Sequence, residues 1–78
     1  MSKRKSVKVY INNFNEIKEF VNTANKYPNL DLESGRHCVS ASSLMGLFSL
    51  NLSEAVDLTY PEENHDEIVS DFSKWIID

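Results

Sequence analysis

Two histidines, one cysteine and a serine that precedes an apolar run are the side chains that could carry chemistry in this sequence. Imidazole titrates near neutral pH and can move protons or bind metals, and a thiolate is a nucleophile. His65 lies among acidic residues, but their spacing matches no standard set of metal ligands. We expect His37 and His65 to be solvated on the surface and Cys38 to pack on a strand. The sequence therefore predicts no metal and no cofactor.

The serine belongs to the stretch 40–52, around which the rest of the chain is organised. A serine just before apolar residues favours a helix start, because its hydroxyl accepts a hydrogen bond from an unpaired backbone N–H. Ser42 and Ser43 are both candidates for this cap, and we predict a helix of about two to three turns after them. Gly46 lowers the helix propensity by about 1 kcal/mol relative to Ala, so tertiary packing must hold this helix.

This short helix is apolar on more than one side. If Leu47 and Leu50 face a core, a second apolar group lies elsewhere on the helix, made of Leu44, Met45 and Phe48. A small domain seldom exposes such a patch without a partner. We therefore predict that this second group binds a protein, the alternative being that neighbouring elements bury both groups.

The other elements follow from the spacing of apolar residues. Strands are predicted at 6–11, 30–33, 36–41 and 55–60, with a turn at Ser34-Gly35, Cys38 or Val39 pointing inward, and Pro61 ending the last strand. Helices are predicted at 14–27 and from 62 onward. Their buried stripes comprise Phe14, Ile17, Phe20, Val21, Ala24 and Tyr27 in the first, and Ile68, Val69, Phe72, Trp75 and Ile76 in the last. The order β-α-β-β-α-β-α predicts an α+β fold, with helices on one face of a mostly antiparallel sheet.

Length and charge narrow the possible functions. The 78 residues predict a single domain, 1–78, with a modest core, in which 1–5 form a flexible basic tail. The net charge of −4, with eight acidic residues from Glu54 onward, argues against nucleic acid as the main partner. A single cysteine excludes an intrachain disulfide and suits a reducing, cytoplasmic location. No apolar run is long enough to span a membrane, so no membrane partner is expected.

Three segments together carry a family resemblance. They read Ser43-Leu44-Met45-Gly46-Leu47-Phe48-Ser49-Leu50, Thr23-Ala24-Asn25-Lys26-Tyr27, and a Gly turn at Gly35 followed by Val39. The first resembles the Ser-Ile-Met-Gly segment and following helix of the HPr family, the phosphocarrier proteins of the bacterial sugar phosphotransferase system. The second is similar to that family's Thr-Ala-Ser-Lys-Phe helix end. The resemblance covers nearly the whole chain and implies an open-faced sandwich, a four-stranded antiparallel sheet covered by three helices.

The resemblance breaks at the residue that carries the phosphoryl group. HPr proteins carry it on a His that opens the first helix, in a Gly-(Ile/Leu)-His-Ala-Arg-Pro-Ala segment. Aligned back from Thr23-Ala24, that His falls on Asn13, the Arg on Asn15 and the Pro on Glu16. An amide cannot be a reversible phosphoryl carrier, Asn15 adds no positive charge, and Glu16 repels a phosphate. The helix N-terminus alone would still favour an anion, but the reactive atom is absent.

Ser43 aligns with the regulatory serine that a dedicated kinase phosphorylates in some HPr proteins. A phosphate there would add nearly two negative charges beside the apolar group of the short helix. The alternative is a plain helix cap, whose loss would lower stability by about 1 kcal/mol.

These features predict a non-catalytic regulatory or adaptor module of the HPr type, not an enzyme. It would bind a protein partner, either phosphotransferase-system enzymes or a transcriptional regulator, through Leu44, Met45 and Phe48 with residues near Asn13, and Ser43 phosphorylation would modulate this binding. One alternative is a phosphocarrier of phosphoenolpyruvate-dependent sugar transport that uses an unrecognised site. Another is a structural homo-oligomer in which the apolar helix pairs with itself. The expected state is a monomer or a weak homo-oligomer.

Overall fold

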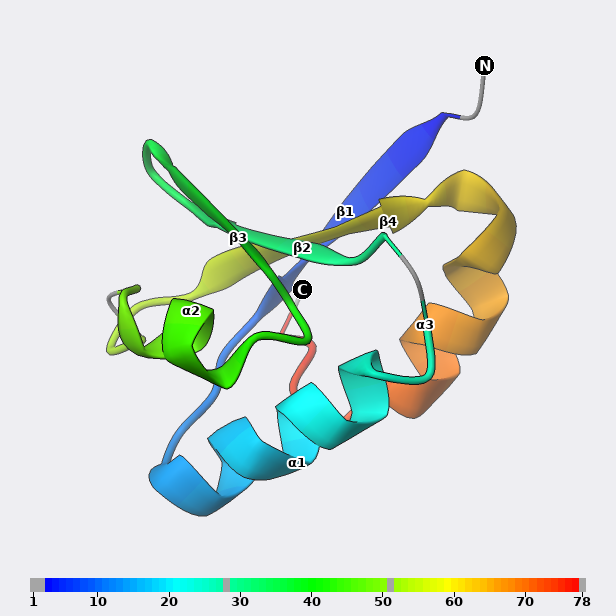
Figure 1. Ribbon diagram of the computed structural model, residues 1–78. Helices are drawn as coiled ribbons and strands as arrows, with labels where there is room; N and C mark the ends of the chain where they lie inside the picture. The colour runs from blue at the N-terminus through cyan, green and yellow to red at the C-terminus, as the bar shows by residue number, and fades with distance from the viewer. Residues whose placement is uncertain (1–2, 28, 51, 78) are drawn as a thin grey trace.

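The computed structural model describes residues 3–27, 29–50 and 52–77, which form an α+β fold with its helices on one face of a sheet (Figure 1). The described elements are β1 (Arg4–Val9), α1 (Phe14–Ala24), β2 (Asp31–Ser34), β3 (His37–Ser40), α2 (Leu44–Phe48), β4 (Val56–Pro61), a 3₁₀ turn η1 (Glu62–Asn64) and α3 (His65–Asp71). The sheet has four strands in the order β1-β4-β2-β3, and every neighbouring pair is antiparallel. The predicted open-faced α+β arrangement and the order of its elements are confirmed.

Strand β1 starts earlier in the chain than the alternation of apolar residues suggests. Arg4 pairs with Pro61 and Lys5 with Tyr60, so residues 4 and 5 are part of the sheet. The prediction of a flexible tail over 1–5 is wrong for these two residues, because backbone pairing with β4 holds them whatever their charge; residues 1 and 2 lie outside the described residues. Strand β4 ends at Pro61, as predicted, with Pro61 as its last residue. The next residue, Glu62, donates its N–H to the carbonyl of Lys3 at 2.8 Å.

The chain returns to β1 at its C-terminal end. The N–H of Tyr10 donates to the carbonyl of Trp75 at 2.8 Å, and the N–H of Ile77 donates to the carbonyl of Lys8 at 3.1 Å. Between these two hydrogen bonds, Val9 and Ile76 form an antiparallel β-bridge. This segment therefore covers part of the edge of β1, which would otherwise present unpaired backbone groups to solvent.

The core lies between the sheet and the helices and is entirely apolar among its fully buried members. Its largest fully buried side chains are aromatic, and Phe20 lies 4.8 Å from Phe72 and 5.1 Å from Trp75 between ring centroids. Helix α1 buries Ile17, Phe20, Val21 and Ala24, as its spacing predicts. Two predicted core residues are instead exposed: Phe14, at the first turn of α1, and Val69, on α3. Both helices are shorter than predicted, because α1 ends before Tyr27 and a 3₁₀ turn precedes α3.

The β2–β3 hairpin projects from the sheet (Figure 1) and turns at Gly35, whose φ of +60° is the left-handed conformation that glycine adopts without strain. Val39 is half-buried against the core. Cys38 alternates to the opposite face of β3 and is exposed, so the prediction that it packs in the strand interior is wrong. Strand geometry sends successive side chains to opposite faces, and only one of the two neighbours can point inward.

Candidate functional site

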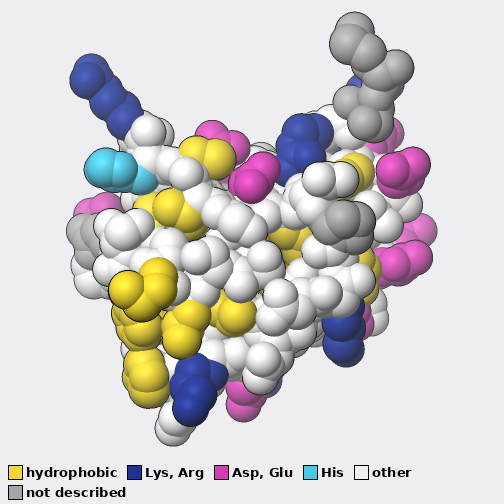
Figure 2. Space-filling model, in the orientation of Figure 1, with side chains coloured by type: hydrophobic (Ala, Val, Ile, Leu, Met, Phe, Trp, Pro, Cys, Tyr) yellow, Lys and Arg dark blue, Asp and Glu magenta, His cyan; other side chains and the backbone are white. Residues whose placement is uncertain are grey.

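An exposed apolar surface lies where the start of α1 meets α2. We call it the apolar face and define it as Phe14, Met45 and Phe48, which are 53%, 79% and 47% exposed. The rings of Phe14 and Phe48 are stacked, with centroids 5.5 Å apart and planes 11° from parallel. Figure 2 shows hydrophobic side chains gathered on this side of the molecule. A contiguous exposed apolar patch of this kind is typical of a protein-binding surface.

The start of α1 is held by a reciprocal pair of hydrogen bonds. Asn13 is the N-cap, with an extended backbone (φ −149°, ψ 174°), and its side-chain oxygen accepts from the N–H of Glu16 at 3.0 Å. The Glu16 carboxylate accepts in turn from the N–H of Asn12 at 3.2 Å. One first-turn donor, the N–H of Glu16, and the N–H of Asn12 just before the cap are thereby satisfied. This arrangement fixes Phe14, the first residue of the helix, on the exposed side.

Helix α2 is held in the same way by Ser43. Ser43 is its N-cap (φ −101°, ψ 109°) and accepts from the N–H of Gly46 at 3.1 Å. Of the two candidate caps, Ser43 is therefore the one used, and Ser42 instead shares a hydrogen bond with Ser40 at 3.0 Å between their hydroxyl oxygens. With five residues, α2 is shorter than the predicted two to three turns.

Gly46 has a packing role in α2. A Cβ on Gly46 would lie 3.1 Å from the Cβ of Val39 and 3.2 Å from the hydroxyl oxygen of Ser43. The missing side chain therefore allows α2 to pack closely on β3. This close approach points Leu47 into the core, where it is fully buried, and leaves Met45 outside.

A depression of about 380 Å³ borders the apolar face, at the junction of β1, the start of α1 and the segment after α2. Its lining is mostly apolar and aromatic, with amide and hydroxyl groups and no charged side chain among the described residues: Tyr10, Ile11, Asn12, Asn13, Phe14, Ile17, Phe48, Leu52 and Ser53. Three aromatic rings thus border one hollow. Such a surface recognises an uncharged, flat group better than an ion.

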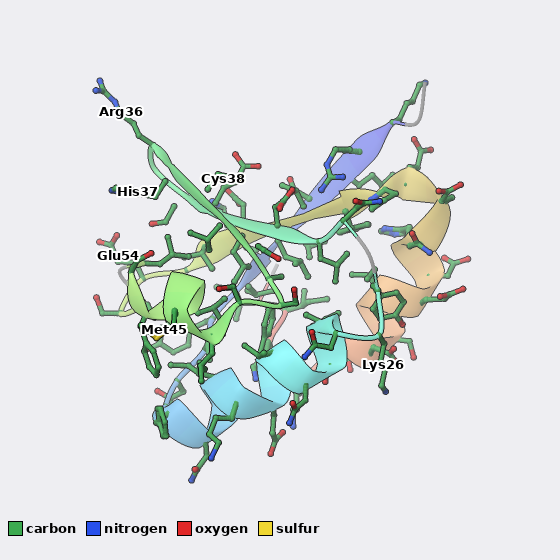
Figure 3. All side chains as sticks on the ribbon, viewed as in Figure 1. Lys26, Arg36, His37, Cys38, Met45 and Glu54 are labelled. Carbon is green, nitrogen blue, oxygen red and sulfur yellow. The ribbon has the colours of Figure 1, made fainter. Side chains whose placement is uncertain are left out.

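The structure brings most of the predicted binding residues together. Asn13 and Phe48 line the same depression, and Met45 extends from the outer side of α2 (Figure 3). Leu44 is only partly accessible, because it packs against the core cluster. Ser43 is half-buried at the start of α2, and Asn15 is exposed on the first turn of α1.

Two residues of this surface were not predicted as binding residues. Phe14 fits the helical stripe of α1, but it comes one turn before Ile17, where it stacks on Phe48 and has Lys18 over its ring instead of entering the core. Tyr10 lies within the strand predicted at 6–11. It is 38% exposed and follows the end of β1. The sequence does place a Tyr and a Phe on either side of the Asn-rich turn, which could have indicated a shared surface. Only the contact with α2 shows that they form one.

The two histidines differ from each other in their environments. His37 is exposed at the tip of the hairpin and points away from the helices, next to Arg36 (Figure 3). His65 was expected to be solvated, but it is half-buried: its Nδ1 lies 2.7 Å from the hydroxyl of Tyr60, and the two rings are stacked. Tyr60 is fully buried, and this burial raises the pKa of its hydroxyl. The pair joins β4 to α3 and lies outside the lining of the depression.

Cys38 lies on the sheet, outside the lining of the depression. Desolvation, followed by the carboxylates of Asp31 and Glu33, raises the pKa of its thiol. A thiol with a raised pKa is mostly protonated at neutral pH and is a poor nucleophile. Over 3–27, 29–50 and 52–77, no group of three or more His, Cys, Asp or Glu side chains is placed to hold a metal ion. None of the helices described is both long and apolar enough to cross a membrane.

Comparison of the chain with protein-family models, with curated proteins and with solved structures finds no match. The geometry of the apolar face and its depression therefore carries the functional argument.

Proposed function

We propose that this protein is a non-catalytic adaptor or regulatory module of the HPr-like type, which binds a protein partner through the apolar face. The observation that carries the proposal is the exposed, stacked pair of Phe14 and Phe48, with Met45 beside it. The stacked rings of Phe14 and Phe48 already hold each other in place, so they lose little conformational freedom on binding. They are therefore suited to be the few residues that supply most of the binding free energy.

The fold supports the HPr-like part of the proposal. The structure has the element order β-α-β-β-α-β-α, and its α2 begins at Ser43, where the resemblance to the family's Ser-Ile-Met-Gly segment is strongest. Within this arrangement, the start of α1 and the short helix α2 form one surface. The candidate partners are phosphotransferase-system enzymes or a transcriptional regulator, located in the cytoplasm.

The start of α1 supports a module without phosphoryl transfer. The side-chain oxygen of Asn13 is engaged as the helix cap, and its amide has no nucleophilic nitrogen that could carry a phosphoryl group reversibly. The carboxylate of Glu16 already accepts from the N–H of Asn12, so a negative charge occupies the end of the helix where a phosphate would bind. A second anion would be repelled there.

The binding surface can be tested with charge-introducing variants of the apolar face. Met45→Glu and Phe48→Glu, alone and combined, are expected to weaken capture of partners by at least tenfold, because a carboxylate would be buried in an apolar contact. The matched control is Val69→Glu, which introduces the same charge at a 37% exposed apolar residue on α3. Affinity capture followed by mass spectrometry measures the outcome, and circular dichroism verifies the folding of each variant. If the folded double variant kept every partner that the parent protein captures, the proposal would be wrong.

Phosphorylation of Ser43 is the proposed means of regulation and is tested separately by intact mass. In one arm the protein is incubated with phosphoenolpyruvate and the phosphotransferase enzyme, and we expect no mass gain. In the other it is incubated with ATP and the HPr serine kinase, and we expect a gain of one phosphate that Ser43→Ala abolishes. A gain in the first arm would instead identify a phosphocarrier with an unrecognised site.

A further inference from the structure

We infer that the depression beside the Phe14–Phe48 pair receives an aromatic side chain from the partner, on a segment that also places a carboxylate near Lys18. The inference rests on the proposed function and specifies the chemistry of the partner. It concerns a hollow that the partner fills, whereas Met45 is a protruding contact on the same side of the molecule.

The lining of the depression selects for an uncharged aromatic group. Tyr10, Phe14 and Phe48 contribute their rings, and Asn12 and Asn13 contribute amides. An amide oxygen can accept from a phenol O–H or an indole N–H, and an amide NH₂ can donate to a phenol oxygen. Aromatic rings gain additional stabilisation from offset or edge contacts with other rings. A charged group would lose its hydration here without meeting an opposite charge, because no charged side chain lines the depression among the residues that the structure describes.

The size of the depression favours one side chain over a whole cofactor. Its volume of about 380 Å³ is close to the lower limit of ligand sites, which range from roughly 300 to 1,000 Å³. The hollow is therefore suited to a single large anchor residue of a protein segment, with the rest of that segment lying over the apolar face.

The positive charge of Lys18, close to the depression, indicates that a carboxylate accompanies the aromatic anchor of the partner. The ammonium of Lys18 lies 5.6 Å from the centroid of the Phe14 ring, in a cation–π contact. Across residues 3–27, 29–50 and 52–77 it forms no salt bridge, whereas its neighbour on α1, Glu19, is paired with Lys74. Of the carboxylates close by in sequence, Glu16 already accepts from the N–H of Asn12. A partner carboxylate would therefore find an ammonium without a salt bridge among the described residues, beside Phe14, whose ring lines the depression.

The test uses three acetylated, amidated tripeptides and free indole, each titrated into isotopically labelled protein at physiological ionic strength. The peptides are Glu-Trp-Gly, Gln-Trp-Gly and Glu-Ala-Gly, and binding is followed through the amide NMR signals. We expect the Glu-Trp-Gly peptide to shift the signals of Tyr10, Asn12, Phe14 and Phe48. We expect it to bind roughly three- to fivefold more tightly than the Gln-Trp-Gly peptide, the range of a weak surface ion pair. The Glu-Ala-Gly peptide should bind at least tenfold more weakly.

Two protein variants separate the parts of the inference. Phe48→Ala removes one wall of the depression and should weaken both Trp peptides by at least fivefold, whereas Val69→Ala, at an exposed apolar site on α3, should leave them unchanged. Lys18→Gln should remove the preference for Glu over Gln. Equal binding of all three peptides, shifts confined to other surfaces, or free indole binding as tightly as the Glu-Trp-Gly peptide would each overturn the inference. If any of these occurred while Met45→Glu and Phe48→Glu still lost their partners, the proposed function would stand and only the anchor would be rejected.

Discussion

The two outer surfaces of this molecule differ in their exposed side chains: one carries paired charged groups, and the other carries apolar groups. On the open face of the sheet, charged side chains from different strands pair with one another: Arg4 on β1 with Asp31 on β2 at 3.3 Å, and Lys8 on β1 with Asp57 on β4 at 3.1 Å. Arg4 also donates to the carbonyl of Asn29 at 2.9 Å. On the apolar face of the helices, Phe14, Met45 and Phe48 are exposed to solvent; Phe14 stacks on Phe48, and the ammonium of Lys18 lies over the Phe14 ring.

The contrast indicates where a partner would gain most by binding. A protein that docked on the sheet would remove water from charged side chains that are already paired with each other, which gives little net stabilisation. Docking on the apolar face would remove exposed apolar surface from water, worth roughly 25 cal/mol for each Å² buried. An open-faced fold always leaves one sheet face to solvent, so the polar sheet surface follows from the architecture. The apolar helix surface does not, and it is therefore the more informative of the two.

The largest expected effect separates the two sides of α2. Leu47→Ala should lower the free energy of unfolding by about 3 kcal/mol, because Leu47 is fully buried and its truncation leaves a cavity. Met45→Ala, two residues away and 79% exposed, should change it by less than about 0.5 kcal/mol. Urea unfolding followed by tryptophan fluorescence measures both, since Trp75 is in the core. A large loss of stability for Met45→Ala would show that the apolar face is part of the folded core.

These two residues also show how far the sequence leads. Helical spacing separated Leu47 from Met45 correctly, because positions on a short helix map directly onto its sides. The same spacing placed Phe14 in the core, but Phe14 is 53% exposed and stacks on Phe48 of α2, a contact that periodicity within one helix cannot reveal. The fold and its order were predictable from alternation and helical stripes. The depression was not, because Tyr10, Asn12 and Leu52 meet there only through tertiary packing.

His65 and Cys38 show the same limit in the sheet region. His65 was expected to be solvated, as a surface imidazole commonly is, and Cys38 to pack on a strand, with either Cys38 or Val39 pointing inward. The structure half-buries His65 against Tyr60, which comes from a strand, and exposes Cys38 on the outer face. His65 packs on Tyr60, only five residues earlier, because the chain turns back between β4 and α3. The exposure of Cys38 instead follows from which face of β3 is covered by elements distant in sequence.

The next effect tests how closely α2 must approach the sheet to present the apolar face. Helix propensity alone predicts that Gly46→Ala stabilises the protein by about 1 kcal/mol. We expect the opposite, a loss of about 1 kcal/mol, because the new methyl would meet the Cβ of Val39 at 3.1 Å, an atom fixed to the backbone of β3. Thermal unfolding measures the sign. A higher melting temperature would mean that α2 can move away from β3 without penalty.

A polar contact within the helix layer gives an effect of similar size that depends on pH. Tyr27 donates a hydrogen bond to the carboxylate of Asp71, and this bond raises the pKa of Tyr27 to about 12. Folding therefore favours the neutral phenol, so its stabilisation is complete below pH 10 and is lost between pH 10 and about 12. Tyr27→Phe should lose about 1 kcal/mol at pH 7 and lack this part of the alkaline decline. Urea midpoints of both proteins from pH 7 to 12 measure it, and parallel profiles would contradict the assignment.

The smallest expected effect concerns the sheet surface itself. A double-mutant cycle of Lys8→Ala and Asp57→Ala should give a coupling of about 0.5 kcal/mol at low salt, because both side chains are about half exposed. In 1 M NaCl the screening length falls to about 3 Å and most of the coupling should disappear. Met45→Ala should show no such salt dependence, since its contacts carry no charge. A coupling that persisted in high salt would mean that the sheet face holds its charges as tightly as a binding surface does, and the distinction between the two faces would fail.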